Sequence, residues 1–315
     1  MANLNLEKAI ISVLVYHDLL DYPLTALEIF KYLDKSFLKD HPSLFEVQTC
    51  LEKSPWLKNI LEQKKGFYFI QGREKLAAKR ISRRKIADKK WKKIQKIANF
   101  LQFLPYLRMM GVTGSLTLNN TRPGSDLDLL LIVKPGRIWT SRFLITGLIS
   151  LMGKKRQAQN TKDKICLNSY LTEDALEIKP EIKPHDRHAA YEYFRLIPLL
   201  EIKPGLFQSF QKANTWLKNN FFFSDNQKNN LRTIKANKWL GWLRFFLEKS
   251  LNNKLGDFLE KNLSQWQKNK IKKNLKILQP DDQIFFSDQF LMFHPHSKAP
   301  RLAKAYRLKM KRLLG

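Results

Sequence analysis

The residues with the clearest potential for chemistry are two aspartates that alternate with leucines inside an apolar run. Asp126 and Asp128 follow a Pro-Gly turn and precede an apolar stretch that ends at Val133. Side chains alternate across a strand, so both carboxylates share one face with Leu130 and Ile132. Neighbouring carboxylates repel each other, and burying them is unfavourable unless a cation compensates their charge. The pattern predicts a divalent metal site, with Mg²⁺ (or Mn²⁺) as the ion.

A Gly-Ser pair lies upstream of the aspartates and could supply hydrogen-bond donors for the phosphates of a metal-bound substrate. Gly114 and Ser115 follow an apolar strand expected over 107–112, and ten residues separate them from Asp126. Glycine lets the backbone approach an anion closely, and the amides and the Ser115 hydroxyl can donate to phosphate oxygens at the start of a short helix. The alternative is an ordinary buried strand that tolerates two aspartates.

The order Gly114-Ser115, ten residues, Asp126-Leu-Asp128 resembles the signature of the polymerase-β-type nucleotidyltransferase superfamily. The resemblance implies an α/β (α+β) fold with a small mixed sheet and two Mg²⁺ ions. It also implies attack by an acceptor on the α-phosphate of a nucleoside triphosphate, with release of pyrophosphate. Asp126 and Asp128 would be the catalytic metal ligands, and Gly114 and Ser115 would hold the phosphates.

A departure from the superfamily lies on the next core strand, which we expect over 164–171. The superfamily usually places a third carboxylate there, and this chain has Asn168 in the apparent position. Asparagine coordinates metal weakly and cannot take a proton. Alternatives for the third-acid position follow directly: Glu173, Asp174 and Glu177. Between the two strands, a helix is expected over 138–152.

The chain divides by composition into four parts. We predict a winged-helix-like domain over 1–72, a basic linker helix over 73–105, a nucleotidyltransferase core over 106–183 and a mostly helical C-terminal region over 184–315. In the C-terminal region we expect helices over 188–200, 206–219 and 238–278, and their aromatic residues at helical spacing favour core positions over a base-stacking platform. Among them are Trp239, Trp242, Phe245 and Phe258. His294 and His296 flank a proline and are interpreted as a surface loop.

The first 72 residues predict three helices followed by a hairpin. A helix is expected from Leu6 to Leu19, and capping boxes at Thr25 and Ser43 open two more. Strands over 57–61 and 67–70 would form the wing. This unit has eight Lys/Arg and nine Asp/Glu, a net charge of −1. Because phosphate attraction dominates nucleic-acid affinity, we expect protein contact, packing on the core or a reduced DNA role.

Residues 73–97 carry twelve Lys/Arg and two acids on an expected amphipathic helix. One interpretation places this helix along a phosphate backbone. The other is a solvated linker helix whose apolar stripe packs on the next domain. The possible polyanion contacts are Arg80, Arg83, Arg84, Lys89, Lys90, Lys92 and Lys93. Arg137 and Arg142 are further candidates, for the triphosphate.

The whole chain of 315 residues has a formal net charge of +29, which points to a nucleic acid or another polyanion as a possible partner. Cys50 and Cys166 are isolated, which predicts a reducing compartment and no zinc site. No apolar run is long enough to span a bilayer, so we expect a cytoplasmic protein without a membrane partner. The oligomeric state is left open.

Two functions fit these observations. The first is a metal-dependent nucleotidyltransferase that moves a nucleoside monophosphate from a nucleoside triphosphate to an unidentified acceptor. The second is a catalytically impaired nucleotidyltransferase-like protein that acts as a nucleic-acid-binding or regulatory module, a hypothesis motivated by Asn168. Antibiotic, tRNA, protein side chain and nucleic-acid terminus are all compatible acceptors.

Overall fold

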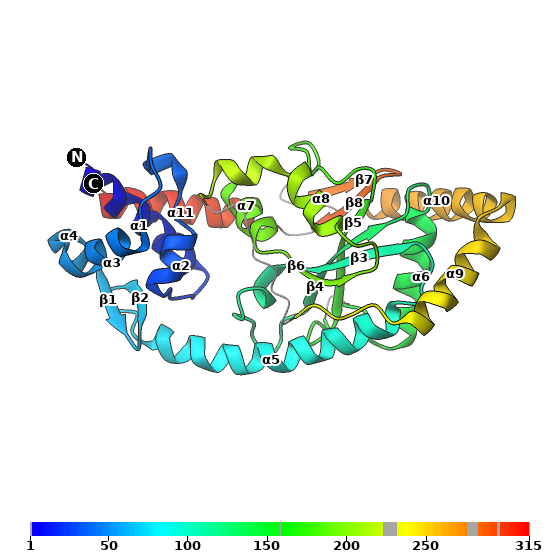
Figure 1. Ribbon diagram of the computed structural model, residues 1–315, viewed down its shortest axis with the longest axis horizontal. Coiled ribbons are helices and arrows are strands. Elements are labelled where there is room, and N and C mark those ends of the chain that lie inside the picture. The colour runs from blue at the N-terminus through cyan, green and yellow to red at the C-terminus, as the bar shows by residue number, and fades with distance from the viewer. Residues whose placement is uncertain (1, 158, 223–231, 276–282, 295–296, 315) are drawn as a thin grey trace.

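The computed structural model describes residues 2–157, 159–222, 232–275, 283–294 and 297–314, and the molecule is elongated (Figure 1). The N-terminal helices and hairpin form one end, and a mixed sheet occupies the middle. The other end is formed by α9 (Lys238–Leu251) and α10 (Lys254–Leu275). Helix α5 (Lys75–Leu101) runs along one side and links the N-terminal end to the sheet.

The central sheet has the strand order β6-β3-β4-β5-β8-β7. Strand β4 pairs in parallel with β5, and the other neighbouring pairs are antiparallel. The strands are β3 (Leu107–Val112), β4 (Leu127–Val133), β5 (Ile165–Thr172), β6 (Ile197–Glu201), β7 (Gln283–Phe286) and β8 (Phe290–His294). Helix α6 (Ile138–Leu151) connects β4 to β5. The mixed sheet and its helices confirm the predicted α/β fold class.

The apolar run of β4 is buried on both faces, with the alternation expected from the sequence. Leu127, Leu129, Leu131 and Val133 belong to a core shared with α5 and α6. Leu130 and Ile132 belong to a second core, which includes α1 (Ala2–Leu19) and α7 (Arg187–Phe194). The face of β4 that carries Asp128 is therefore the face toward the N-terminal helices and α7.

The three predicted N-terminal helices are present. Thr25 and Ser43 form the predicted capping boxes with Glu28 and Glu46. The predicted strand over 57–61 is wrong, because Ser54 caps a short helix there and the first strand begins at Leu61. The remaining elements of this unit are α2 (Ala26–Lys31), η1 (Lys35–Phe37), α3 (Leu44–Lys53), α4 (Pro55–Lys58), β1 (Leu61–Lys64) and β2 (Phe67–Ile70). The winged-helix interpretation stays a prediction.

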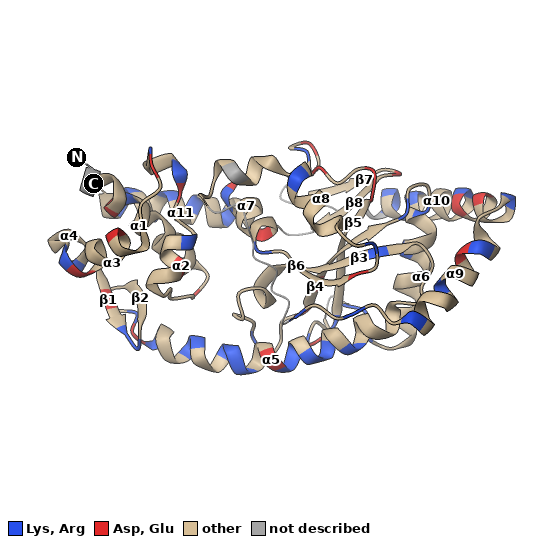
Figure 2. Cartoon of the chain, viewed as in Figure 1, with Lys and Arg blue, Asp and Glu red and all other residues tan. Residues whose placement is uncertain are grey.

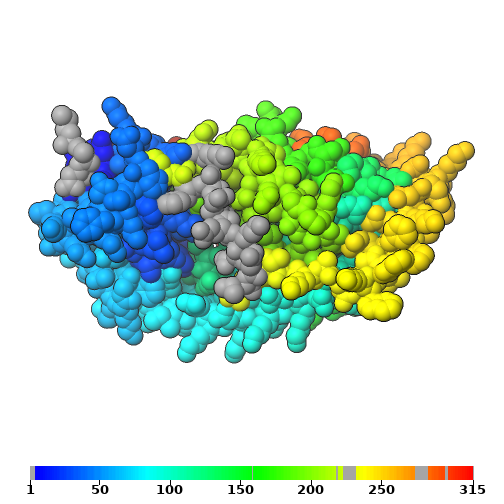
Figure 3. Space-filling view, viewed as in Figure 1, coloured from blue at the N-terminus to red at the C-terminus, as the bar shows by residue number. Residues whose placement is uncertain are grey.

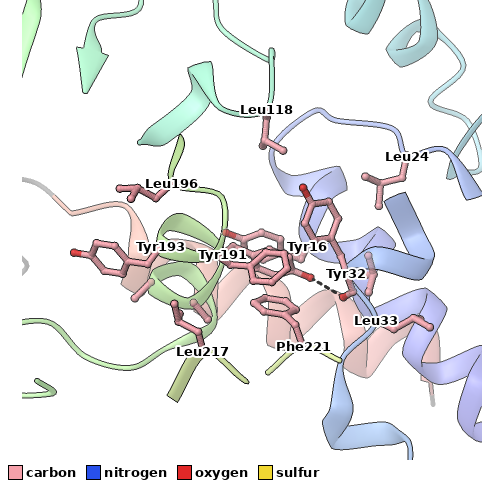
Figure 4. Close-up of a cluster of buried hydrophobic side chains, with 14 of the residues drawn as sticks. Tyr16, Leu24, Tyr32, Leu33, Leu118, Tyr191, Tyr193, Leu196, Leu217 and Phe221 are labelled. Carbon is pink, nitrogen blue, oxygen red and sulfur yellow. Dashed lines mark hydrogen bonds between the residues drawn. The ribbon is translucent and has the colours of Figure 1, made fainter. Parts of the chain in front are cut away.

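The N-terminal unit packs on the rest of the chain through aromatic side chains (Figure 4). The ring of Tyr16 on α1 stacks on Tyr191 of α7, with centroids 4.3 Å apart. Helix α11 (Ala299–Leu314) lies against α1, and Ser12 Oγ is 2.7 Å from the Tyr306 hydroxyl oxygen. The unit thus shares a core with the sheet, in line with one of the roles expected for it.

The C-terminal region is mostly helical but also supplies three strands of the sheet. The helix expected over 188–200 is wrong in its second half, since α7 ends at Phe194 and β6 follows. His294 ends β8 instead of lying in a loop, and His296 lies outside the described residues. The other elements of this region are α8 (Leu206–Ala213) and η3 (Thr215–Asn219). The core draws strands from both sides of residue 183.

The aromatic residues of this region divide into two groups. Tyr191, Phe194, Phe207 and Phe210 are buried, as predicted for core positions. The prediction is wrong for four others, because Trp239, Trp242, Phe245 and Phe258 are exposed on α9 and α10. Helical periodicity showed that these side chains share a face, but it did not show which face of the helix meets the protein.

Candidate active site

Strands β3 and β4 bring the Gly-Ser pair beside the aspartates. Asp126 immediately precedes β4, and Asp128 is its second residue. The Thr113 amide, at the end of β3, donates to the Asp128 carbonyl oxygen over 3.1 Å. Antiparallel pairing therefore sets Thr113 opposite Asp128, and Gly114, the next residue, lies beside the Asp128 carboxylate.

Gly114 is in contact with the Asp128 carboxylate. Its φ is +71°, and a Cβ atom at this position would lie 2.5 Å from Asp128 Oδ2. Any side chain here would collide with the carboxylate and strain the backbone. Ser115 follows in η2 (Gly114–Leu116), a single 3₁₀ turn closed by a hydrogen bond from Thr117 Oγ1 to the Gly114 carbonyl oxygen. At Gly114 this loop therefore places bare backbone beside the Asp128 carboxylate.

Strand β5 adds an amide and a thiol to the same face. Parallel pairing sets Cys166 opposite Asp128. Asn168 Nδ2 donates to Asp128 Oδ1 over 2.8 Å, and Cys166 Sγ donates to Asn168 Oδ1 over 2.5 Å. The structure thus places Asn168 in direct contact with one of the two aspartates.

Three side chains meet at a spacing that suits a metal ion. Donor atoms of Asp126, Asp128 and Cys166 lie within 4.8 Å of one another. Two carboxylates fit a hard divalent cation, and a thiolate favours softer ions. Cys166 was not selected from the sequence. The signal for it was its two-residue spacing from Asn168, which puts both side chains on one face of a strand.

A cation from the protein already lies at this site. Arg156 Nε is 2.9 Å from Asp126 Oδ2, and its guanidinium donates to Cys166 Sγ over 3.3 Å. No sequence pattern indicates Arg156, because it lies between α6 and β5 in a segment without regular structure. Its guanidinium compensates part of the negative charge that the two carboxylates bring together.

The environment of Asp128 opposes its ionisation. Burial raises the pKa of this carboxyl to about 7, and the charges of Asp126 and Glu192 add to the rise. The hydrogen bond from Asn168 acts in the opposite direction. Burial and the Asp128 charge also raise the pKa of the Cys166 thiol to about 12. The positive charge of Arg156 therefore does not fully offset burial and the neighbouring acids, an electrostatic condition that favours binding a cation.

Glu192 of α7 is a further acid whose charge reaches Asp128. Burial opposes its ionisation, but Lys183, His294 and His188 outweigh burial and lower its pKa to about 2. The Lys183 ammonium forms an ion pair with it. Glu192 is thus a charged neighbour of the site, held by its own partner. Glu192 lies far from Asp128 along the chain, so the sequence alone could not predict that the two are close in space.

The alternatives for a third acid lie at the other end of the sheet. Glu173 follows β5, and its amide donates to the carbonyl oxygen of Val133, the last residue of β4. Glu173, Asp174 and Glu177 line a separate cavity of about 410 Å³. The length of strand β4 separates them from Asp128, so the structure does not bring these acids to the face that carries Asp126 and Asp128.

The arginines considered as triphosphate contacts are engaged by α10. Arg137 forms an ion pair with Asp257 at 2.5 Å, and Arg142 donates to Gln267 Oε1 over 2.5 Å. Arg142 also lies over the ring of Phe293, 4.8 Å from its centroid. Both side chains therefore fix α10 against α6.

Basic residues are distributed along α5 (Figure 2), and their side chains divide into buried or paired ones and exposed ones. Arg80 pairs with Glu28, and the buried Arg83 donates to Asn120 Oδ1 over 2.8 Å. Lys93 pairs with Asp163 at 2.5 Å. The exposed residues of the predicted set without an ion pair among the described residues are Arg84, Lys89 and Lys92. Much of the predicted polyanion surface thus holds the protein together.

Lys90 has a structural role beside the candidate active site. It is 2% exposed and donates to the carbonyl oxygens of Pro123 and Ser125 over 3.1 and 2.6 Å. It also pairs with Asp163 at 2.7 Å. This ammonium fixes the turn that leads into Asp126.

These residues fall within a segment that a family model recognises. The model of the nucleotidyltransferase domain matches residues 94–197, from the end of α5 to the start of β6. The match covers 104 of the 315 residues. The match agrees with the resemblance to the polymerase-β-type superfamily and supports nucleotidyl transfer as the general function. Searches of curated proteins and of solved structures gave no match.

The nucleotidyltransferase domain contains the whole carboxylate cluster, together with Gly114 and Arg156. Among the residues that the structure describes, no helix has the length and apolar character needed to cross a membrane.

Proposed function

We propose that the protein is a metal-dependent nucleotidyltransferase that moves a nucleoside monophosphate from a nucleoside triphosphate to an acceptor. The acceptor oxygen would bond to the α-phosphorus, the bond from that phosphorus to the bridging oxygen would break, and pyrophosphate would leave. The observation that carries this proposal is the contact of Gly114 with the Asp128 carboxylate, which puts backbone without a side chain beside the carboxylates that would hold a metal.

Each side chain has a distinct part in this proposal. Asp126 and Asp128 would hold a divalent ion, which would neutralise charge on the triphosphate when bound. The amides around Gly114 and the Ser115 hydroxyl would donate to the β- and γ-phosphates. Asn168 holds Asp128 through Oδ1 and leaves Oδ2 on the side of Gly114. Catalysis would come mainly from positioning and charge neutralisation.

A metal-binding and labelling experiment tests this function. Full-length protein should bind Mn²⁺ and should release pyrophosphate while transferring label from an α-labelled triphosphate in the presence of Mg²⁺ or Mn²⁺. Asp126→Asn and Asp128→Asn should abolish transfer and weaken Mn²⁺ binding at least about tenfold. Asp174→Asn is the matched control, since Asp174 is exposed beyond the far end of β4. Unchanged transfer in both site variants would refute the assignment.

A second function keeps support from two contacts. Asn168 occupies the position beside Asp128 and cannot act as a base, and the Arg156 guanidinium neutralises Asp126 without a metal. Both contacts fit a catalytically impaired protein that binds nucleic acid or regulates a partner. That function predicts no pyrophosphate release with any acceptor and salt-sensitive binding to DNA or RNA.

A further inference from the structure

Helix α9 faces the protein with its polar side and solvent with its aromatic side. None of its residues is buried, and Trp239 and Trp242 are 84% and 61% exposed. Phe245 and Phe246 are each 57% exposed, and Phe258 of the adjoining α10 is 63% exposed. Soluble proteins rarely expose contiguous apolar surface of this kind without a binding role. The α9–α10 aromatic surface comprises Trp239, Trp242, Leu243, Phe245, Phe246 and Phe258.

Ion pairs and hydrogen bonds fix this orientation of α9. Glu248 accepts a two-pronged interaction from Arg108 of β3, with N–O distances of 2.8 and 2.9 Å. Arg244 donates to the Gln102 carbonyl oxygen over 3.1 Å, and the Asn237 amide donates to Gln102 Oε1 over 2.6 Å. Rotating the helix to bury its aromatic side would expose Arg244 and separate Glu248 from Arg108. The exposed aromatic side is therefore built into the fold.

Charges around the surface are positive. Residues 232–275 contain eleven Lys/Arg and three acids. All three acids bind within the protein: Glu248 binds Arg108, Asp257 pairs with Arg137 and Glu260 accepts the Trp139 and Thr140 amides. Lys238, Lys249, Lys254 and Lys261 are exposed and form no ion pair within the described part of the chain. Exposed aromatic rings and unpaired lysine ammonium groups therefore lie on the same two helices and are available to bind a partner.

The surface lies away from the nucleotidyltransferase site. The Tyr106 hydroxyl donates to the Leu251 carbonyl oxygen, and Lys134 donates to Asn252, so the end of α9 contacts the chain just beyond the last residue of β4. Asp126 immediately precedes β4 and Asp128 is its second residue, so both lie near the opposite end of that strand. Helices α9 and α10 form the end of the molecule opposite the N-terminal unit, and α9 is on the visible surface there (Figure 3).

We infer that the α9–α10 aromatic surface binds peripherally to an anionic lipid bilayer. A convex helix with tryptophan and phenylalanine on its crest and lysines at its edges matches an interface where rings enter the headgroup layer and ammonium groups meet anionic headgroups. Self-association through this surface would place the unpaired lysines of one copy next to those of the other, and their like charges would repel. A base-stacking site is normally a groove along which the strand runs, whereas this surface is a helix crest.

This inference departs from the sequence-based expectation of no membrane partner. That expectation rested on the lack of a spanning segment, which surface binding does not need. It is independent of the proposed enzymatic function, so the two can fail separately.

A vesicle experiment tests the inference. Full-length protein is sedimented with vesicles of phosphatidylcholine, with and without phosphatidylglycerol, while tryptophan emission is recorded. We expect binding and a blue shift only with the anionic lipid, and weaker binding at high salt. The double variant Trp242→Ser with Phe246→Ser should bind at least about tenfold more weakly. Its far-ultraviolet circular dichroism spectrum and urea-unfolding midpoint should equal those of the parent protein, which shows that the variant is folded.

A matched variant controls for the loss of exposed rings in general. Phe45 on α3 and Phe100 on α5 are 75% and 46% exposed and lie outside the surface, so Phe45→Ser with Phe100→Ser should bind vesicles as the parent protein does. Three outcomes would overturn the inference: no binding to anionic vesicles, equal loss in both double variants, or a dimer or RNA complex that the surface variant alone abolishes while vesicle binding persists.

Discussion

Asp128 contacts a glycine, an amide and a second carboxylate, and only the amide favours its ionised form. Its carboxyl is therefore poised between binding a proton and binding a cation near neutral pH. Arg156 compensates Asp126 directly but reaches Asp128 only through its longer-range charge. Asp128 is the residue at which an added metal ion would relieve the most unfavourable electrostatic energy.

Asp128→Asn should stabilise the metal-free protein. With a folded pKa of about 7 and an ordinary value of 3.8, the carboxyl favours the unfolded state increasingly as pH rises between these values. We expect the variant to gain about 2–4 kcal/mol in free energy of unfolding at pH 8, and almost nothing at pH 3.5. Urea unfolding in EDTA at both pH values measures this. Destabilisation at pH 8 would contradict the electrostatic account.

The central part of this site could be predicted because its chemistry is local in sequence. Gly114, Asp126 and Asp128 are linked by one hairpin-like connection, and period-two alternation gave their common face. Cys166 and Arg156 depend on the parallel pairing of β4 with β5, whose register no short-range pattern specifies. Asn168 was anticipated from the superfamily pattern, and the structure gives it a partner in Asp128.

Helix α5 acts as a structural support for the active-site turn. Its apolar stripe, including Trp91 and Ile94, packs on the sheet, and Lys90 reaches from it to the residues before Asp126. Trp91 Nε1 donates to Asn119 Oδ1 over 3.1 Å, which ties the helix to the connection between β3 and β4. One side of α5 therefore packs on the protein, as the linker-helix interpretation predicts. The other side exposes Arg84, Lys89 and Lys92, and of the predicted polyanion contacts only these residues remain candidates.

Lys90→Met should loosen the active-site turn. The substitution keeps the buried volume but removes three hydrogen bonds and leaves Asp163 with Lys93 alone. We expect a loss of about 2–4 kcal/mol in free energy of unfolding. Mn²⁺ affinity should also fall, because Asp126 follows the loosened turn. Lys92→Met, on the exposed side of the same helix, should change neither quantity, and an equal effect of the two variants would contradict this role.

Elements with strong local signals were predictable, and those set by distant contacts were not. Capping boxes marked α2 and α3, and the apolar runs of β3, β4 and β5 marked the core strands. Residues 197–201 are a short apolar segment containing a proline, which periodicity cannot separate from the end of a helix. The orientation of α9 depends on the pair between Arg108 and Glu248, which are far apart in sequence.

At the scale of the whole molecule, we expect the N-terminal unit and the sheet to unfold as one cooperative structure, because they share a hydrophobic core. Tyr191 is fully buried between α1 and the C-terminal region, against Tyr16, His17, Tyr32 and Phe221 (Figure 4). The same core contains residues of β4 and α11. Unfolding the N-terminal unit alone would expose this interface, so the energetics favour a single transition.

Tyr191→Ala should destabilise both ends of the molecule together. Truncating a fully buried aromatic side chain typically lowers the free energy of unfolding by about 3–5 kcal/mol. Far-ultraviolet circular dichroism and tryptophan fluorescence should still report one transition, at a lower denaturant concentration. Tyr191→Phe should lose much less, since its hydroxyl makes only a 3.4 Å hydrogen bond to the Tyr32 carbonyl oxygen. Two separated transitions in the parent protein would show that the units fold independently.

The contact between Gly114 and Asp128 has a thermodynamic consequence for the proposed function. Because the loop that would hold phosphates touches the carboxylate that would hold metal, occupancy of one must change the free energy of the other. Such linkage is reciprocal, so metal raises the affinity for a triphosphate by the same factor by which the triphosphate raises the affinity for metal. Substrate and ion would then bind as one cooperative unit rather than in an obligatory order.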